Sequence, residues 1–374
     1  MKIKLLEAHT FTFLLIVALT LLLFSACNEK KPAVGSEDDI YVIADSSEYY
    51  DLEGSLLTVF SKVIYTPQPE ILFNLKRKNL SELDNLKVFK NIIIIAPLNS
   101  NSQTSKYINS ILDPKVKQLV NEDSVTVINK YNLWADGQLV MFLTAPTLEK
   151  LNQSILKQSE NLLHYFQKES DDRLFKSLYN PRYEKKDIEA KFLKDYGWMI
   201  YVQADYLLAL NVPNDHFVWL RRAPGSDMER WIFIYWKDNA SPEDLNRDSV
   251  YAIRNRLTKK FYRTSDNKSY VEISDDYITT KEVNFLGRYA LMTQGLWRMD
   301  DKSMGGPFVN YVFYDTKTKR IYMLDGSIYA PKYYKKSLIQ QVDVILRSFM
   351  TESELSKDKK QDILSYYPKQ NEKQ

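Results

Sequence analysis

The sequence predicts an α+β protein with mainly antiparallel or mixed sheets and helices on one face of them. From Ile40 onward, short runs rich in Val, Ile, Tyr, Phe and Trp alternate with polar stretches. The short runs have the residue preference of strands, and the polar stretches carry apolar residues at helical spacing. Apolar residues make up 44% of the chain and charged residues 26%, which is typical of a folded protein.

The strands expected from these runs are, in order, 40–44, 70–76, 91–96, 124–130, 138–144, 199–204, 216–221, 231–236, 269–273, 308–314 and 320–329. Helices are expected near 48–63, 102–112, 147–168, 184–195, 242–262 and 332–350. The stretch 147–168 shows the helical period most clearly, because its apolar residues return every three to four positions between charged ones.

One connection between strand and helix recurs along the chain. An apolar strand is followed by a small residue and a proline at Ala96-Pro97, Ala145-Pro146, Ser241-Pro242 and Ala330-Pro331, and each time a helical stretch comes next. Proline suits the first turn of a helix, since its fixed φ fits there and its missing N–H would have no partner.

These connectors fall into two pairs, which favours a tandem duplication of a β-β-α-β-β-α unit. The halves would span 40–168 and 171–350 and join near 169–172. The alternative is a single α+β domain in which strand–proline–helix is only a common connector. After Met350 the tail, residues 351–374, is charged and poor in apolar residues, so we expect it to be disordered.

The amino terminus has the pattern of a lipoprotein signal peptide over residues 1–26. Lys2 and Lys4 precede an uncharged apolar run, 11–26, that is shorter than the roughly 20 residues of a membrane-spanning helix. The run ends at Phe24-Ser25-Ala26, directly before Cys27, the only cysteine. We expect a diacylglycerol group in thioether linkage on the thiol of Cys27, cleavage after Ala26, acylation of the new amino terminus, and a polar tether over 27–39. A plain signal peptide or an uncleaved anchor with an incidental cysteine is the alternative.

Composition excludes several classes of protein. A formal net charge of +3, from 51 basic and 48 acidic side chains, gives no sign of nucleic-acid binding. One cysteine excludes an internal disulfide framework, and three histidines leave little material for a metal site. We therefore expect no cofactor and no metal. His216 opens an apolar strand and is a candidate general base, although an ordinary residue at a strand end is the simpler interpretation.

The segment 287–309 is the strongest candidate for a binding loop. Four of the ten glycines fall within 287–306, which indicates backbone in unusual conformations or close approaches. Arg288 and Arg298 would hold an anion, and Trp297 would offer a stacking surface. Gly305 and Gly306 would offer exposed N–H groups, and Pro307 completes the candidate loop. Alternatively, a tight turn puts Trp297 and Met304 into the core, and Gly-Gly-Pro directs the chain into the strand 308–314.

Several motifs together resemble a known family. They are Pro67-Gln-Pro-Glu-Ile-Leu-Phe73, Trp134-Ala-Asp-Gly137, Thr144-Ala-Pro146, Gly287-Arg-Tyr289, Gly295-Leu-Trp297, Met304-Gly-Gly-Pro-Phe308 and Tyr329-Ala-Pro331. This set, spread over about residues 40–350, resembles the uncharacterised Bacteroidetes lipoproteins catalogued as domain of unknown function 4837. Where that family commonly has Arg before Gly-Leu-Trp, this chain has Gln294. The resemblance implies export and lipid anchoring, and it implies no activity, ligand or catalytic residue.

The sequence thus favours a lipid-anchored outer-membrane protein, facing the periplasm or the cell exterior, that acts as a non-catalytic binding or envelope-assembly module. Its expected partners are the membrane, through the lipid on Cys27, and an unidentified envelope protein or glycan. Two alternatives stay open. One is an envelope hydrolase that uses carboxylates or His216 in a cleft, and the other is a purely architectural protein.

Overall fold

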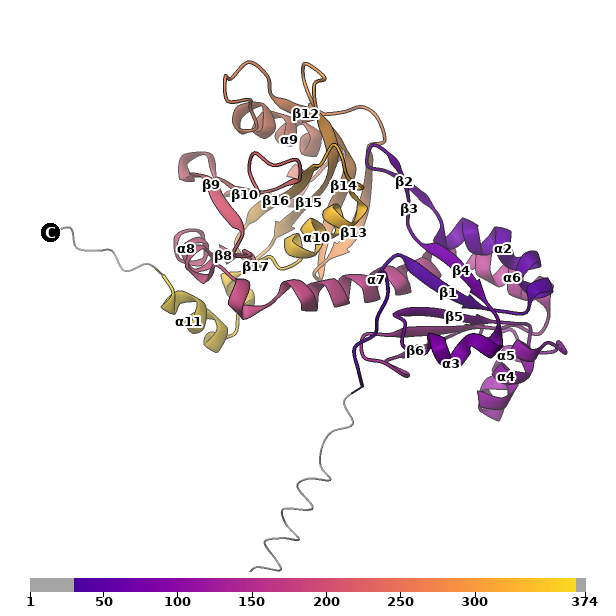
Figure 1. Ribbon diagram of the computed structural model, residues 1–374. Helices are drawn as coiled ribbons and strands as arrows, with labels where there is room; N and C mark the ends of the chain where they lie inside the picture. Colours follow the sequence, from indigo (N-terminus) through magenta and orange to yellow (C-terminus); the bar gives the residue numbers. More distant parts are fainter. Residues whose placement is uncertain (1–29, 368–374) are drawn as a thin grey trace, which may run out of the picture. The chain divides into compact units, whose positions relative to one another are not determined.

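The computed structural model describes residues 30–367, which form two compact units (Figure 1). Unit 1 contains the chain up to Gly54 together with Leu75–Lys157, and unit 2 contains Ser55–Asn74 and the chain from Gln158 onward. The boundary at Lys157 precedes the expected join at 169–172. The expected signal peptide, residues 1–26, and Cys27 lie outside the described residues.

Unit 1 is built on a five-stranded sheet with strand order β4-β1-β5-β7-β6. The strands are β1 (Asp39–Ile43), β4 (Asn74–Lys78), β5 (Asn91–Ile95), β6 (Val127–Tyr131) and β7 (Leu139–Leu143). Strands β1, β5 and β7 are parallel, and β6 pairs antiparallel with β7. Every residue of β5 and β7 is buried, as expected for continuous apolar runs in the middle of a parallel sheet.

The helices of this unit are α2 (Ser46–Phe60), whose last residues belong to unit 2, η1 (Leu80–Glu82), α3 (Leu83–Leu86), α4 (Gln103–Ile111), α5 (Pro114–Asn121) and α6 (Leu148–Lys157). Helices α3, α4 and α5 share an apolar cluster with Ile92 and Phe142 of the sheet. Helix α6 and the start of α2 lie on the other face (Figure 1). The prediction of helices on one face is therefore wrong for this sheet, because strands buried on both sides need cover on both.

Part of the expected tether, 27–39, is docked on unit 1. Pro32 and Val34 form isolated β-bridges with Asp136 and Phe89, and the N–H of Val34 donates to the carbonyl of Val88 at 2.8 Å. The N–H of Asp136 also donates to the carbonyl of Lys31 at 2.9 Å, so this part of the expected tether is attached to unit 1.

Unit 2 contains an eight-stranded sheet with order β12-β14-β15-β16-β11-β10-β9, and β13 pairs with β14. Its strands are β9 (Tyr206–Val212), β10 (Phe217–Arg222), β11 (Glu229–Lys237), β12 (Val271–Ile273), β13 (Thr279–Phe285), β14 (Arg288–Met299), β15 (Gly305–Asp315) and β16 (Arg320–Tyr329). All of these pairings are antiparallel. Two small pairs complete the strands of the unit: β2 (Val63–Tyr65) with β3 (Pro69–Ile71), and β8 (Trp198–Met199) with β17 (Met350–Thr351).

The helices of unit 2 are α7 (Ser159–Leu178), α8 (Lys186–Tyr196), α9 (Arg247–Phe261), α10 (Lys336–Leu346) and α11 (Lys357–Ser365), with 3-10 turns η2 (Pro181–Tyr183), η3 (Pro213–Asp215), η4 (Pro242–Asp244) and η5 (Glu352–Glu354). Helices cover both faces of the sheet here too. Phe233 of β11 packs with Leu257 of α9, whereas its neighbour Ile234 belongs to the cluster that contains Val342 of α10. Successive strand residues point to opposite faces, so β11 contributes to two cores.

The tandem duplication is not what the structure shows. One sheet contains three parallel strands, and the other is an antiparallel sheet with a different strand order. The recurring strand–proline–helix connector describes only how the chain leaves a strand. It does not determine which strands pair, because pairing depends on residues distant in sequence. The coarser prediction, an α+β protein with mixed and antiparallel sheets, agrees with the structure.

The tail expected to be disordered from residue 351 is ordered as far as Tyr367. Its helix α11 lies against α8, and Ile363 is 2% exposed in a cluster with Ala190 and Leu193. Lys186 of α8 pairs with Asp362 at 3.2 Å. A few apolar residues among many charged ones therefore suffice to hold this helix.

Candidate functional site

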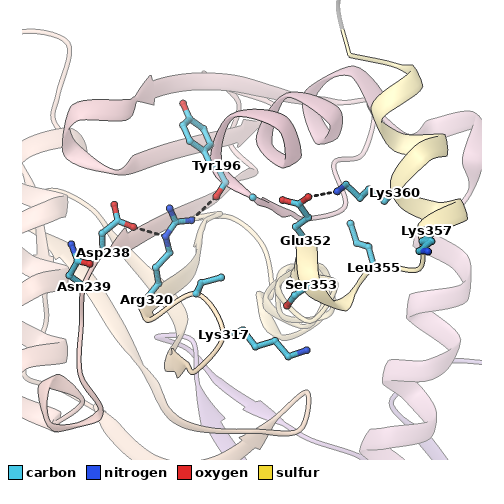
Figure 2. Close-up of a pocket in the computed structure, with 12 residues that line it drawn as sticks. Tyr196, Asp238, Asn239, Lys317, Arg320, Glu352, Ser353, Leu355, Lys357 and Lys360 are labelled. Carbon is cyan, nitrogen blue, oxygen red and sulfur yellow. Dashed lines mark hydrogen bonds and ion pairs between the residues drawn. The ribbon is translucent and has the colours of Figure 1, made fainter.

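A pocket of about 870 Å³ opens in unit 2, and four separate segments form its wall (Figure 2). They are the end of α8 at Tyr196–Gly197, the turn after β11 at 238–239, the β15–β16 turn with the start of β16, and the chain from η5 to α11. Its volume lies in the range typical of small-molecule sites, about 300–1,000 Å³.

Local sequence explains why these segments stop and turn where they do. Helix α8 ends at Gly197, whose φ of +77° is the left-handed conformation that glycine adopts without a steric penalty. In the β15–β16 turn, the backbone N–H and the hydroxyl of Thr318 both donate to Asp315 Oδ2, at 2.8 and 2.6 Å. Each turn is thus fixed by its own residues, and the fold brings the turns together.

Arg320 connects two of these segments (Figure 2). Its Nε donates to Asp238 Oδ1 at 2.5 Å, and its Nη1 donates to the carbonyl oxygen of Tyr196 at 2.6 Å. On the opposite side of the wall, Glu352 is paired with Lys360. Both pocket carboxylates therefore already have a cationic partner.

His216 lies next to this wall, which its position in the sequence alone could not indicate. Its Nε2 is 3.4 Å from Asp238 Oδ2, and its ring stacks on Trp236 with centroids 5.3 Å apart. The residue has a φ of +52° at the end of η3, and this conformation directs it back toward β11. Within residues 30–367 no Ser or Thr hydroxyl is hydrogen-bonded to His216, so the structure supplies it with an acidic partner but with no nucleophile.

Positive charge exceeds negative charge in the pocket. Its cationic residues are Lys317, Arg320, Lys357 and Lys360, and its carboxylates are Asp238 and Glu352. Arg320 and Lys360 pair with the two carboxylates. Lys317 and Lys357 form no ion pair or side-chain hydrogen bond with any described residue, and both are exposed. The surplus of two positive charges favours an acidic ligand.

The segment predicted as a binding loop is instead a pair of long strands, β14 and β15, joined by a short turn. Trp297 is 1% exposed, and its Nε1 donates to the carbonyl of Ile328 at 3.1 Å. Its ring is therefore not available for stacking with a ligand. The alternative interpretation is correct in placing Trp297 in the core, but Met304 is 37% exposed and does not fill the core.

The two arginines of this segment have acidic partners within the chain. Arg288 pairs with Glu354, and Arg298 Nε donates to Glu272 Oε1 at 2.9 Å. Gly305 and Gly306 lie in β15, where a Cβ on Gly306 would be 2.0 Å from the carbonyl oxygen of Ile328. Pro307 stands opposite Leu296 in the ladder. The glycines thus permit close packing of strands, and these six residues do not form one loop.

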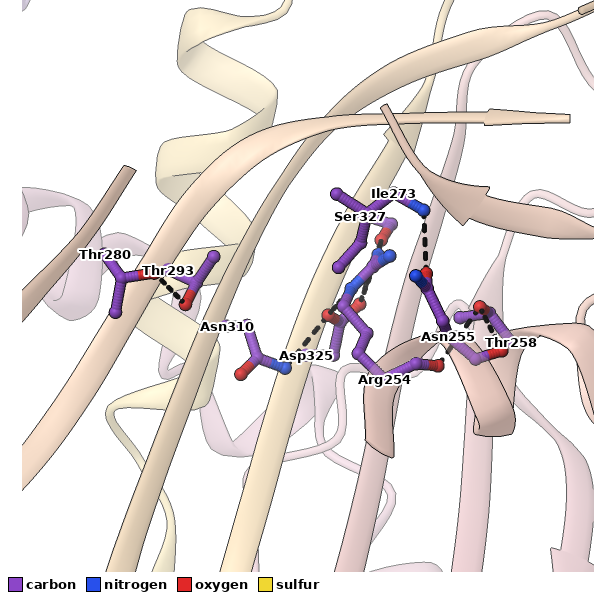
Figure 3. Close-up of polar contacts among 9 residues, drawn as sticks. All are labelled: Arg254, Asn255, Thr258, Ile273, Thr280, Thr293, Asn310, Asp325 and Ser327. Carbon is purple, nitrogen blue, oxygen red and sulfur yellow. Dashed lines mark hydrogen bonds and ion pairs between the residues drawn. The ribbon is translucent and has the colours of Figure 1, made fainter. Parts of the chain in front are cut away.

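A buried polar network lies beneath α9 (Figure 3). Arg254 Nε donates to Asp325 Oδ2 at 2.7 Å, and the same carboxylate accepts from Asn310 and Ser327 at 3.1 and 2.9 Å. The guanidinium also lies 3.7 Å from the ring centroid of Phe308. Arg254 and Asp325 have no solvent exposure, so this network has a structural role.

The sequence carried one signal for that network. Arg254 falls between Val250 and Leu257 on the buried side of α9, a place where an unpaired cation would be costly. No such signal marks the charged residues of the pocket, because they come from separate parts of the sequence. They are Asp238, Lys317, Arg320, Glu352, Lys357 and Lys360. Among the described residues, no group of three or more His, Cys, Asp or Glu could hold a metal ion, and no helix is long and apolar enough to cross a membrane.

Some proteins of known structure are weakly similar to part of this chain. Two structures of Mog1 are similar: the Ran-binding protein Mog1p of Saccharomyces cerevisiae is 10% identical and a mutant of Mog1 12% identical. They match 43% and 41% of this chain, over 93% and 90% of their own lengths, with TM-scores of 0.28 and 0.27. A protein from Bacteroides thetaiotaomicron is 5% identical over 42% of this chain and 46% of its own, with a TM-score of 0.24. TM-scores this low carry no argument about function, and no curated protein matches the chain.

Family models divide the chain in two. The model DUF4837 matches residues 185–348 and DUF8532 matches residues 33–179, so the family expected over 40–350 extends over the second part only. The motifs Met304–Phe308 and Tyr329–Pro331 lie inside the DUF4837 match, whereas Pro67–Phe73 and Trp134–Gly137 fall within DUF8532. Residues 185–348 of this chain thus match the family model DUF4837, and residues 33–179 match DUF8532, both described as domains of unknown function.

Proposed function

We propose that the chain is a lipid-anchored protein of the cell envelope, attached to the outer membrane through acyl chains on Cys27, and that unit 2 binds an acidic envelope ligand without catalysing a reaction. The anchoring part rests on the apolar run 11–26 and the small residues before Cys27. The binding part rests on one observation, the pocket in which Lys317 and Lys357 are not neutralised by the protein itself.

Charge and shape support a ligand of this class. The pocket is concave and large enough for one or two sugar rings or a short acidic peptide segment, at about 870 Å³. Leu355 adds an apolar surface to a wall that is otherwise polar and charged. Exposed lysines that have no ion-pair partner attract anions over several ångströms. Added salt screens this attraction, so the affinity for an anion falls as the salt concentration rises.

A non-catalytic role follows from the state of the candidate catalytic groups. Asp238 is bound by Arg320 and faces His216, while Glu352 is bound by Lys360. Each of these carboxylates already has a hydrogen-bonded cation as its partner, so neither is left free to act on a ligand. His216 has no hydroxyl nucleophile hydrogen-bonded to it in the described part of the chain.

An envelope hydrolase is the second candidate, and a specific arrangement favours it. Asp238 and Glu352 line the same pocket, and His216 lies 3.4 Å from Asp238. Glycoside hydrolysis uses two carboxylates on either side of the scissile bond. If the pocket hydrolyses its ligand, Asp238→Asn and Glu352→Gln will each abolish product formation from an acidic oligosaccharide while binding persists.

The binding proposal is tested by calorimetric titration of the protein with oligogalacturonate and with a neutral galacto-oligosaccharide of the same length. We expect binding of the acidic sugar only, and a loss of at least tenfold in affinity for the double variant Lys317→Glu/Lys357→Glu. Lys268→Glu/Lys302→Glu reverses the same number of charges at exposed positions outside the pocket and should bind within twofold of the unmodified protein. Equal affinity of the two double variants, or a preference for the neutral sugar, would refute the proposal.

A further inference from the structure

Three polar side chains form a row across neighbouring strands of the unit 2 sheet. Arg222 of β10 stands directly opposite Tyr206 of β9 on one side and directly opposite Arg230 of β11 on the other. Residues directly opposite in an antiparallel pair share a face, with Cβ atoms about 4.5–5.5 Å apart. Tyr206 belongs to the cluster that contains Val342 of α10, so the row lies on the α10 face of the sheet.

Arg230 is the unusual member of this row. It is 8% exposed, its Nε is buried without a hydrogen-bond partner, and it forms no ion pair with any described residue. A buried guanidinium nitrogen without an acceptor destabilises the fold, and a bound anion would supply that acceptor. Burial and the neighbouring Arg222 both lower the pKa of Arg230, in that order of size.

The surroundings of Arg230 supply only part of the balancing negative charge. The carboxylate of Asp205 acts on Arg230 through space, but its ion pair is with Arg222, at 2.5 Å, and it is half exposed. Tyr206 is 1% exposed, and its hydroxyl is also buried with no hydrogen-bond partner. On one face of the sheet, Nε of Arg230 and the hydroxyl of Tyr206 thus lack an acceptor within residues 30–367.

A second buried arginine of the same unit shows the contrast. Arg254 has no solvent exposure and is matched by Asp325 at 2.7 Å, with Asn310 and Ser327 completing the hydrogen bonds of that carboxylate. The buried arginine with a structural role thus has its counter-ion within the protein. Among the described residues none forms an ion pair with Arg230, and the like charge of Arg222 stands beside it.

We propose that Arg230, Arg222 and Tyr206 form a binding site for a carboxylate group, separate from the pocket at Asp238. The positive charges of Arg222 and Arg230 exceed the one negative charge of Asp205, so the row favours an anion. A guanidinium binds a carboxylate through two parallel N–H···O bonds, and the tyrosine hydroxyl donates a third. Lys185, whose Nζ donates to the carbonyl of Tyr206 at 2.7 Å, adds positive charge at the edge of β9.

The site is distant from the pocket already described. Arg230 stands at the start of β11, and Asp238 follows the last residue of that strand. Eight residues of extended strand span about 25 Å. Binding at the two places can therefore be measured independently, and the failure of one proposal leaves the other standing.

Thermal unfolding in acetate tests the site, with sodium chloride added to keep the ionic strength constant. Saturating acetate should raise the Tm of the unmodified protein by about 3 °C or more. Arg230→Met should show no acetate-dependent rise, while its Tm in buffer alone equals or exceeds that of the unmodified protein, because a buried cation without a partner has been removed. Tyr206→Phe keeps the ring and removes one donor, so its rise should be smaller.

Two controls separate this site from general charge effects and from the pocket. Lys268→Met removes the same charge from a side chain that is 84% exposed and should keep the full acetate response. Lys317→Glu/Lys357→Glu should also keep it. An N-acetylated dipeptide is then compared with its C-terminal amide: a rise with the free acid alone identifies a peptide carboxylate as a source, and a rise with acetate alone identifies a small acid.

Three results would overturn the proposal. They are no rise with acetate or the dipeptide acid, an equal rise in Arg230→Met, and a rise with inorganic phosphate but none with either carboxylate.

Discussion

Arg254 and Asp325 form an ion pair at 2.7 Å in which neither side chain has any contact with solvent. The pair joins α9 to β16, and Asn310 and Ser327 complete its hydrogen bonds (Figure 3). Because both charges are removed from water, the loss of one partner leaves the other buried and uncompensated.

Asp325→Asn should therefore lower the free energy of unfolding by about 3–5 kcal/mol, measured by urea denaturation. The matched control is Asp227→Asn, which breaks the pair between Lys332 and Asp227 whose side chains are 71% and 53% exposed. That exposed pair should be worth less than about 1 kcal/mol. A similar small loss for both variants would contradict a structural role for the buried pair.

Gly306 should tolerate no side chain. A Cβ there would lie 2.0 Å from the carbonyl oxygen of Ile328 and 3.1 Å from Nε1 of Trp297, and a backbone atom cannot move aside without disturbing the ladder. Gly306→Ala should cost about 3 kcal/mol or more. Gly54→Ala is the control: Gly54 lies in α2 with no other atom within 4 Å of the added carbon, so the change should gain about 0.5–1 kcal/mol. Urea denaturation measures the free energy of unfolding of both variants. An unchanged value for Gly306→Ala would mean that the strands separate easily at this point.

Asp171 should make stability depend on pH. Burial, and then the nearby carboxylate of Asp343, raise the pKa of Asp171 to about 6 from 3.8, although Gln340 donates to it at 2.8 Å. Because the folded protein holds this proton more tightly than the unfolded chain, the contribution of Asp171 to stability is fully present below about pH 4 and is lost as the pH rises through about 6.

Asp171→Asn keeps a hydrogen-bond acceptor for Gln340 and removes the titration. At pH 7 this variant should be more stable than the unmodified protein by about 1–2 kcal/mol, and the difference should shrink toward pH 4. Urea denaturation between pH 4 and 7 measures it, with Asp172→Asn as the neighbouring exposed control. If the free energies of unfolding of Asp171→Asn and of the unmodified protein change in parallel with pH, Asp171 does not cause the pH dependence of stability.

The proposed lipid anchor predicts that fatty acid labels a single residue, Cys27. Cells expressing the full chain and fed radioactive palmitate should yield a labelled protein, and Cys27→Ser should yield none and should also block cleavage of the signal peptide. An unlabelled protein in cells where a known lipoprotein is labelled would remove the proposed anchor, and with it the proposed location.

The strands that could be predicted from sequence are those with their own strong local pattern. The run of isoleucines in β5 and the aromatic and β-branched residues of β11 gave bounds within about two residues of those observed. Strand β14 was missed because its glycine and polar residues resemble a loop. It is a strand because β13 and β15 supply hydrogen bonds on both sides, and those partners are not visible in a local window.

The single helix predicted over 147–168 is two helices in the structure, α6 and α7, which meet at Gln158. The apolar period continues through both, and α7 extends to Leu178. Periodicity identifies the apolar face of a helix, but it does not show where one helix ends and the next begins.

The candidate site could be predicted only in part. His216 was singled out, and it does lie beside Asp238 at the pocket wall. The lysines and Arg320 belong to turns that the fold brings together from distant parts of the chain, so no spacing in the sequence relates them. The glycine-rich segment was misleading because glycine serves close strand packing as readily as it serves a binding loop.

Hydrogen–deuterium exchange with and without oligogalacturonate shows where on unit 2 an acidic ligand binds. We expect slower exchange in the β15–β16 turn, 316–320, and in the segment 352–360, with no change in β14. Unchanged exchange in both pocket segments, or slowing confined to another part of unit 2, would mean that the pocket is not the binding site.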